Sequence, residues 1–389
     1  MPDWLRRGGF VIAGVLPILL LILNSNEGWH RHPGLWETSR YLINDLLLAI
    51  VTVEIVILGF MMRKTRKVLT GFSLALASLL ACWVALDLYV VVLNHESTGP
   101  GGQLCLTHRN WFQRVVSNNK HGFWEEEIEP FSSSERPEGM TVIAAVGDSF
   151  TWGQGLSSAD LRYTERLDEM LGDQVEVLNF GHGGYNTRDM IERVLPTVEE
   201  LKPDVVVYFY LANDIHDGIG MASPQPKERS KWQRRFLVGV PVYNYLYWKV
   251  FAAFDFSQEA ERGYHALYAR YQDPQNFADH QADLRKFAQT VRDMGAIPVA
   301  VNLPFPHLWS SAEPELRLQI NDKVIQALRD AGMPTQDLSQ LEKTYPVGQF
   351  EVNSMDAHPS AEVHQAIAQK VEPWLREQSK IFLNPTSTE

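Results

Sequence analysis

From residue 141 onward, short apolar runs alternate with longer amphipathic runs. The first of these runs, Val142 to Val146, contains no polar residue, which is typical of a strand covered on both faces. Such alternation predicts a parallel sheet with helices on both of its faces. The predicted strands are Thr141–Val146, Val175–Asn179, Val205–Leu211 and Ala296–Asn302, and the predicted helices are Ser158–Leu171, Thr187–Leu201, Phe277–Met294, Glu315–Ala331 and Ser360–Gln378.

Three unusual turns follow the first three predicted strands. Gly147-Asp148-Ser149 ends the first strand, a glycine-rich stretch over 181–184 ends the second, and Asn213-Asp214 ends the third. Ligands of parallel α/β sheets lie beyond the carboxyl ends of the strands. We therefore expect these turns to meet at one crevice.

The residues of these turns are suited to nucleophilic catalysis. A serine hydroxyl needs a base and a site for the developing oxyanion. Ser149 is the predicted nucleophile, His358 the base and Asp356 the group that orients the imidazole. The backbone N–H groups of Ser149 and Gly184 and the Asn213 side chain are the predicted oxyanion donors. Each residue alone is more often structural, so the prediction depends on their joint occurrence at the strand ends.

Four sequence blocks together resemble the SGNH (GDSL-type) hydrolases, a family of serine esterases, lipases and carbohydrate deacetylases. The blocks are Gly147-Asp148-Ser149-Phe150-Thr151, Asn179-Phe180-Gly181-His182-Gly183-Gly184, Ala212-Asn213-Asp214 and Asp356-Ala357-His358-Pro359. The resemblance covers roughly residues 119–378 and implies a flavodoxin-like α/β/α three-layer sheet. It also implies that Ser149 is the nucleophile, His358 the base, and that Ser149, Gly184 and Asn213 form the oxyanion hole.

The chain departs from the family pattern at two positions. Leu211 stands where the third block often has glycine, and the acid Asp356 lies two residues before His358 instead of three. The shorter spacing also occurs in the family. Residues i and i+2 of an extended segment face the same way, so we expect Asp356 to reach His358.

The first 93 residues contain three apolar segments, Phe10–Leu23, Leu42–Met62 and Val68–Leu93. We interpret them as a unit of three transmembrane helices, although the short first segment could also be a cleaved signal peptide. Basic residues at Arg6, Arg7 and 63–67 place the N-terminus in the cytoplasm. The catalytic part is then periplasmic or extracellular, and a bacterial inner membrane is the expected location.

Glu54 lies near the middle of the second apolar segment, and an ionisable group at that depth is costly unless it has a role. One interpretation is a hydrogen-bonded carboxyl group that faces the other two helices. The alternative is contact with a partner membrane protein or a lipid headgroup. Asp45 and Asp87 lie nearer the outer ends of their segments.

The expected domains are a transmembrane unit over 1–93, a connector over 94–140 and a catalytic domain over 141–389. An aromatic-rich insertion over about 215–276 interrupts the catalytic domain. We interpret it as a cap over the crevice or a membrane-facing surface, unless its aromatic residues form a small core of their own.

The charge balance argues against a nucleic-acid partner, because residues after 93 contain 27 Lys/Arg and 41 Asp/Glu. The histidine pairs His30/His32 and His358/His364 lack a third ligand at suitable spacing, so we expect neither a metal nor a cofactor.

These features predict a membrane-anchored serine esterase that deacylates an envelope glycan, glycolipid or lipid. One alternative is an O-acyltransferase that passes the acyl group to a sugar hydroxyl. Another, from a different class, is a non-catalytic glycan-binding scaffold that holds partners through its spans.

Overall fold

A computed structural model describes residues 35–62, 67–97, 104–125, 137, 139–215, 237, 239–251, 265–305 and 314–383. These residues belong to two compact units. The first takes its residues from 1–110 and 226–254, and the second from 111–225 and 255–389. The domain boundaries expected from the sequence stay a prediction.

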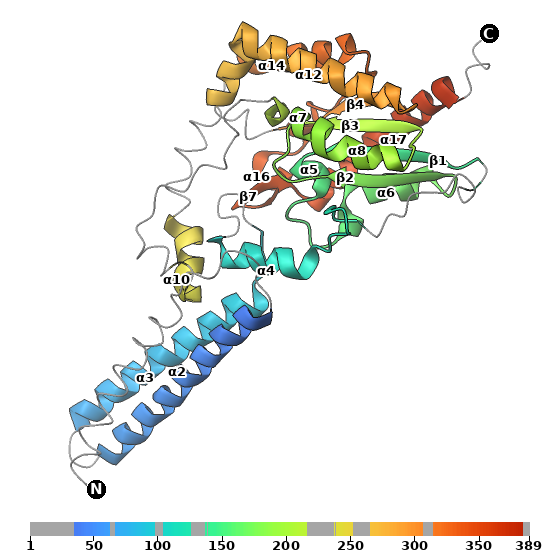
Figure 1. Cartoon of the computed structure of the whole chain (residues 1–389). Coiled ribbons are helices and arrows are strands. Elements are labelled where there is room, and N and C mark those ends of the chain that lie inside the picture. Colours follow the sequence, from blue (N-terminus) through green and yellow to red (C-terminus); the bar gives the residue numbers. More distant parts are fainter. Residues whose placement is uncertain are drawn as a thin grey trace. The chain divides into compact units, whose positions relative to one another are not determined.

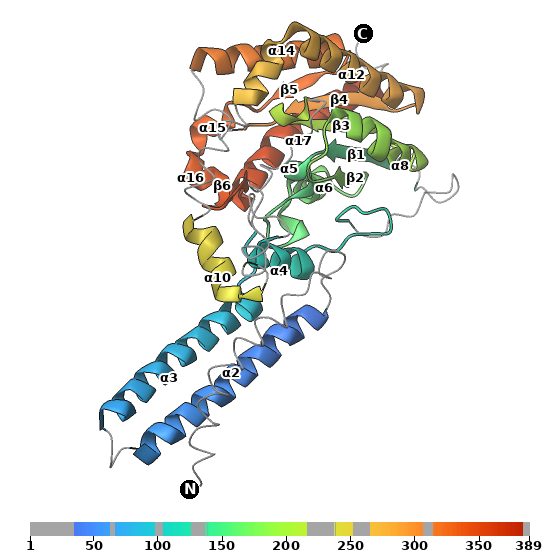
Figure 2. The ribbon, with the colours of Figure 1, turned by 60° about the vertical axis from the view of Figure 1, so that its left-hand side comes forward.

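A five-stranded parallel sheet forms the centre of the second unit, with strand order β2-β1-β3-β4-β5 (Figures 1 and 2). The strands are β1 Thr141–Gly147, β2 Val175–Gly181, β3 Val205–Tyr210, β4 Ile297–Asn302 and β5 Thr335–Asp337. The predicted parallel sheet is confirmed, and each of the four predicted strands is present with ends shifted by at most two residues.

Helices cover both faces of this sheet (Figure 2). Phe209 of β3 packs on Tyr163 of α6 (Tyr163–Leu171) with ring centroids 4.5 Å apart, whereas the preceding Tyr208 stacks on Phe287 of α12 (Pro274–Asp293), also at 4.5 Å. Since successive strand residues point to opposite faces, α6 and α12 lie on opposite sides. α17 (Ala361–Leu383) packs beside α6, and α14 (Pro314–Asp330) packs beside α12. The result is a three-layer α/β/α arrangement.

The helices and helical turns of the second unit are α5 Ser149–Trp152, η3 Ala159–Leu161, α6 Tyr163–Leu171, α7 Thr187–Asp189, η4 Met190–Val194, α8 Leu195–Glu200, η5 Ala212–Asp214, α12 Pro274–Asp293, α14 Pro314–Asp330, α15 Leu341–Thr344, α16 Val347–Phe350 and α17 Ala361–Leu383. A further helix covers 265–272. α4 Leu106–Val115 contains the boundary between the two units.

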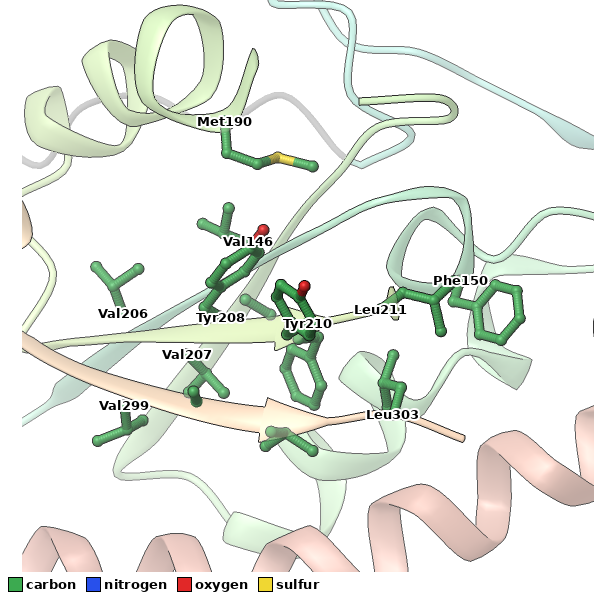
Figure 3. Packing of buried hydrophobic residues seen from close by; sticks show 14 of the residues in the cluster. Val146, Phe150, Met190, Val206, Val207, Tyr208, Tyr210, Leu211, Val299 and Leu303 are labelled. Carbon is green, nitrogen blue, oxygen red and sulfur yellow. The ribbon is translucent and has the colours of Figure 1, made fainter. Parts of the chain in front are cut away.

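The core lies on both faces of the two central strands. All six residues of β3 are buried, as are Val142 to Gly147 of β1. Figure 3 shows this packing, with Tyr208 and Tyr210 projecting from the same face of β3. A strand buried on both sides needs apolar residues at every position, which explains why these runs lack polar alternation.

Three strands have no counterpart among the predicted elements. β5 follows β4 in the sheet, and a two-stranded antiparallel hairpin joins β6 Glu351–Asn353 to β7 Asp356–Pro359. All three are short and polar, so neither an apolar run nor strict alternation marks them. β5 is a strand because it pairs with β4, and β6 and β7 are strands because they pair with each other.

A helical hairpin dominates the first unit, where α2 Leu35–Met62 packs along α3 Lys67–Leu88, which continues as η1 Tyr89–Leu93 (Figure 1). Among the described residues, one helix, Lys67–Leu93, is long and apolar enough to cross a membrane. α2 covers the second predicted span. The first predicted span, 10–23, lies outside the described residues, so the three-span unit stays a prediction.

The aromatic-rich interval is divided between the two units. α10 Pro241–Leu246 and η6 Tyr247–Phe251 belong to the first unit, where α10 packs on α3 and η1. Tyr268 and Tyr271, on the helix over 265–272, are buried in the core of the second unit. The aromatic residues therefore contribute to two different cores.

Candidate active site

Ser149 lies at the first position of α5, directly after β1. The side chain of Asp148 caps this short helix by accepting a hydrogen bond from the Phe150 amide at 2.9 Å. The end of β2 lies so close to this helix that a Cβ on Gly181 would be 2.2 Å from the Trp152 amide nitrogen. Only glycine fits there, so the β2 glycine allows Ser149 to sit at the carboxyl edge of the sheet.

His358 lies beside Ser149, although the two residues are 209 positions apart. The distance from His358 Nε2 to Ser149 Oγ is 2.8 Å, and His358 Nδ1 makes a short hydrogen bond with Asp356 Oδ1. Both residues belong to β7, whose extended backbone turns side chains i and i+2 the same way. The Asp-x-His spacing therefore brings the carboxylate to the imidazole, as the sequence predicts.

These contacts define the protonation of the imidazole. A carboxylate can only accept, so Nδ1 carries the proton and Nε2 is free to accept from the Ser149 hydroxyl. Burial lowers the pKa of His358, but the charge and hydrogen bond of Asp356 and the charge of Asp148 outweigh it and raise this pKa above 6.5. The arrangement can thus take a proton from Ser149 and stabilise the resulting imidazolium.

The glycine-rich turn after β2 lies on another side of Ser149. A Cβ placed on Gly183 would lie 3.9 Å from the Ser149 Cβ. The next residue, Gly184, has φ +80°, a left-handed conformation that residues with side chains rarely adopt. The turn therefore presents exposed backbone next to the serine.

Asn213 lies on the 3-10 turn η5 that follows β3. Its Nδ2 atom donates to Asp148 Oδ2 at 3.3 Å, so the residue before the serine also holds the amide. Its Oδ1 atom is buried and has no hydrogen-bond partner among the residues that the structure describes. An Asn Nδ2 has two protons, and one remains for a second acceptor.

Two buried acids support the site, and sequence reasoning did not give them these roles. Burial raises the pKa of Asp148. Hydrogen bonds from the amides of Phe150, Asn213 and Ser149 to the charged carboxylate partly offset this rise. Burial and the Asp148 charge raise the pKa of Asp214, which accepts from the Leu211 amide at 2.9 Å. Each acid lies just after a buried strand in the sequence, and this position is the sign by which the sequence could have revealed their roles.

The structure thus brings together Ser149, His358 and Asp356 by direct contacts. Asn213 joins them through Asp148, and the 183–184 turn lies against Ser149. This is the edge of the sheet at which the sequence predicts a crevice.

The chain is similar to several solved structures. That of TesA is 18% identical with TM-score 0.39 and covers 61% of this chain and 99% of its own. A carbohydrate acetylesterase family member from Sinorhizobium meliloti is 15% identical with TM-score 0.37, over 61% of this chain and 98% of its own. A lipase/acylhydrolase from Enterococcus faecalis is 15% identical with TM-score 0.35, over 61% and 97%.

No curated protein matches the chain. Residues 145–366 do match the GDSL-like Lipase/Acylhydrolase family, and this range contains Ser149, Gly184, Asn213, Asp356 and His358. Since the match covers more than half of the chain, the protein belongs to the GDSL-like lipase/acylhydrolase family.

Proposed function

We propose that the protein is a serine esterase that removes an acyl or acetyl group from an envelope glycan, glycolipid or lipid. The observation that carries this proposal is the continuous hydrogen-bond chain from Ser149 through His358 to Asp356. Membership of an acylhydrolase family supports the reaction class.

In the proposed mechanism, His358 Nε2 takes the hydroxyl proton as Ser149 Oγ attacks the ester carbonyl. The oxyanion receives hydrogen bonds from the Ser149 and Gly184 N–H groups and from Asn213 Nδ2. The imidazolium returns the proton to the leaving alcohol, and an acyl-serine remains. Water, deprotonated by His358, then attacks the acyl-serine. The imidazolium returns this proton to the leaving Ser149 Oγ, which releases the carboxylic acid and restores free Ser149 and neutral His358.

A fluorophosphonate probe and an activated acetyl ester test this proposal on the full chain in detergent. We expect stoichiometric labelling at Ser149 and ester turnover, both abolished by Ser149→Ala. Ser157→Ala removes an exposed serine of the same segment and should keep both properties. Absence of labelling in folded wild type would instead support the non-catalytic scaffold.

The O-acyltransferase alternative uses the same acyl-serine. Ser149 is only 8% accessible, so a sugar bound over it would exclude water and place its own hydroxyl next to the acyl group. With ester and a glycan acceptor present together, free acid as the sole product supports the esterase. Acylated glycan supports the transferase.

We further propose that the helical hairpin anchors the protein in a membrane with the catalytic unit outside the cytoplasm. Large apolar side chains on the hairpin are exposed, among them Val68, Phe72 and Leu79 at 86%, 69% and 70%. Such a surface is suited to hydrocarbon. The basic run over 63–67 favours a cytoplasmic position for the connection between the helices.

Glu54 is exposed on α2, whereas Asp45 and Asp87 are buried within the first unit. Asp87 accepts hydrogen bonds from the Val242 amide at 2.8 Å and from Trp83 Nε1 at 3.1 Å. The exposed position of Glu54 supports the proposal that this carboxyl group meets a partner membrane protein or a lipid headgroup.

Cysteine labelling tests the proposed orientation. A membrane-impermeant maleimide should modify a Ser157→Cys variant in intact spheroplasts, and a Lys67→Cys variant only after permeabilisation. The reverse pattern would overturn the orientation. Both substitutions replace exposed side chains, and Cys82→Ser removes the exposed native thiol in each background.

A further inference from the structure

The turn that carries Asn213 is held from beneath by buried tyrosine hydroxyls. On one side of Asn213, Tyr271 donates to the Ala212 carbonyl oxygen at 2.6 Å. On the other side, Tyr208 donates to Asp214 Oδ2 at 3.0 Å. Tyr208 belongs to β3 itself, but Tyr271 comes from the helix over 265–272, which is not part of the sheet.

Tyr271 is the end of a hydrogen-bonded chain with a fixed direction. A carbonyl oxygen only accepts, so the single Tyr271 proton goes to Ala212. In the 2.6 Å contact between the Tyr271 and Tyr210 hydroxyls, the proton must therefore come from Tyr210. Tyr210 then has none left for His280 Nε2 at 2.9 Å, and the imidazole must be the donor.

The last member of the chain meets this requirement. Burial lowers the pKa of His280 to about 3, so the ring is neutral at physiological pH. Its proton sits on Nε2, and its buried Nδ1 has no hydrogen-bond partner among the described residues. Protons thus point in one direction from His280 through Tyr210 and Tyr271 to Ala212, and hydrogen bonds aligned in this way strengthen one another.

The Asn213 side chain has little else to fix it. Its one hydrogen bond given by the structure is the 3.3 Å contact with Asp148, and its Oδ1 is unpartnered within the described part of the chain. The position of Nδ2 therefore depends on where η5 holds the backbone. Small displacements of a catalytic group have large kinetic effects, since an error of about 1 Å can cost roughly 100-fold in rate.

We infer that Tyr271, supported by Tyr210 and His280, is a positioning residue that aims Asn213 at the oxyanion. This inference rests on the proposed esterase function, in which Asn213 is an oxyanion donor. It also assigns a role to the end of the aromatic-rich interval, whose last tyrosine lies under the site. Tyr271 touches no reacting atom and acts through the Ala212 carbonyl.

A double-mutant cycle on the full chain tests the inference with an activated acetyl ester. Tyr271→Phe should lower kcat about tenfold and leave KM within about twofold, because the oxyanion exists only after attack. In the Asn213→Ala background the same substitution should change kcat less than about twofold, since the group it positions is gone. Tyr268→Phe, on the same helix and equally buried, is the control and should keep wild-type kcat.

Three outcomes would overturn the inference alone, provided that wild type is active and Asn213→Ala is impaired. These are wild-type kcat in Tyr271→Phe, an equal loss in both backgrounds, and a rise in KM without a fall in kcat. A wild type that neither turns over ester nor labels at Ser149 would instead overturn the proposed function.

If Tyr271→Phe does not fold, Tyr210→Phe tests the inference instead. This substitution keeps the hydrogen bond between Tyr271 and the Ala212 carbonyl but removes the hydroxyl that donates to Tyr271. We expect kcat to fall about two- to threefold, with no fall in the Asn213→Ala background. An unchanged kcat in otherwise wild-type protein would overturn the inference.

Discussion

The two sides of Ser149 are built differently. On the base side, His358 and Asp356 come from β7, near the far end of the sequence. Nε2 of His358 meets the serine hydroxyl, and Nδ1 makes a hydrogen bond with the Asp356 carboxylate. On the oxyanion side, the donors come from the turns after β1, β2 and β3. The Asn213 turn is supported by buried hydroxyl groups, and Asp148 holds the Asn213 amide.

The two sides of Ser149 therefore differ in how they respond to pH. The base side contains a group that titrates, the His358 imidazole, whose pKa is raised above its ordinary value. The oxyanion donors are amides, which do not titrate at ordinary pH. Substitutions on the base side should therefore alter both rate and pH dependence, and those on the oxyanion side should alter chiefly the rate.

The largest expected effect is the loss of the base. His358→Ala should lower kcat roughly 10⁵- to 10⁶-fold, because His358 Nε2 is the group that accepts the Ser149 proton. Burst and steady-state ester hydrolysis measure this loss. His121→Ala removes an exposed histidine of the same unit and should leave kcat unchanged. A loss of less than about 100-fold in His358→Ala would show that the base side is assigned wrongly.

Replacement of the orienting acid comes next. Asp356→Asn should lower kcat roughly 10⁴-fold, because the amide no longer fixes the Nδ1–H tautomer or stabilises the imidazolium. Steady-state kinetics at a pH well above 7 measures the effect with the imidazole neutral. An unchanged rate would mean that Ser149 and His358 work without an acid and would remove Asp356 from the comparison.

A smaller loss is expected on the oxyanion side. Asn213→Ala should lower kcat roughly 10²- to 10³-fold, as for the loss of one oxyanion donor elsewhere. The fluorophosphonate should still modify Ser149, because the nucleophile and the base are intact. If Asn213→Ala hydrolyses ester at the wild-type rate, the oxyanion side does not include this amide.

The smallest expected effect is a shift in pH dependence. The base acts when neutral, so kcat/KM should rise with pH through a limb above 6.5, the ordinary histidine value that Asp356 and Asp148 raise. Asp356→Asn removes the nearer charge, and the limb should move to lower pH. Asn213→Ala removes no charge and should move the limb much less. Equal shifts in both variants would contradict the division between the two sides.

Much of the fold followed from local pattern. The runs that became β1 and β3 are apolar without interruption because both faces are covered, and that covering can be read from the residues alone. β5, β6 and β7 could not be predicted in this way. Their residues are polar and few, and they become strands only because a partner strand is present.

The residue types of the candidate site were also predictable, because ester chemistry requires a nucleophile, a base and donors for the oxyanion. Residue types do not reveal which groups hold them. Asp148 links the serine turn to Asn213, and Tyr271 reaches the Ala212 carbonyl from 59 positions away. A tyrosine in an aromatic-rich interval carries no local sign of that contact.

The amino-acid sequence was enough to predict the alternating parallel sheet, the order of the turns at its carboxyl edge and the residues suited to acyl chemistry, because these depend on neighbours along the chain. The direction of the hydrogen bonds from His280 to Ala212 and the 2.8 Å contact between His358 and Ser149 came from the folded structure. Both depend on where distant segments meet, and hydrogen bonds over a few ångströms are set by packing of the whole sheet and its helices.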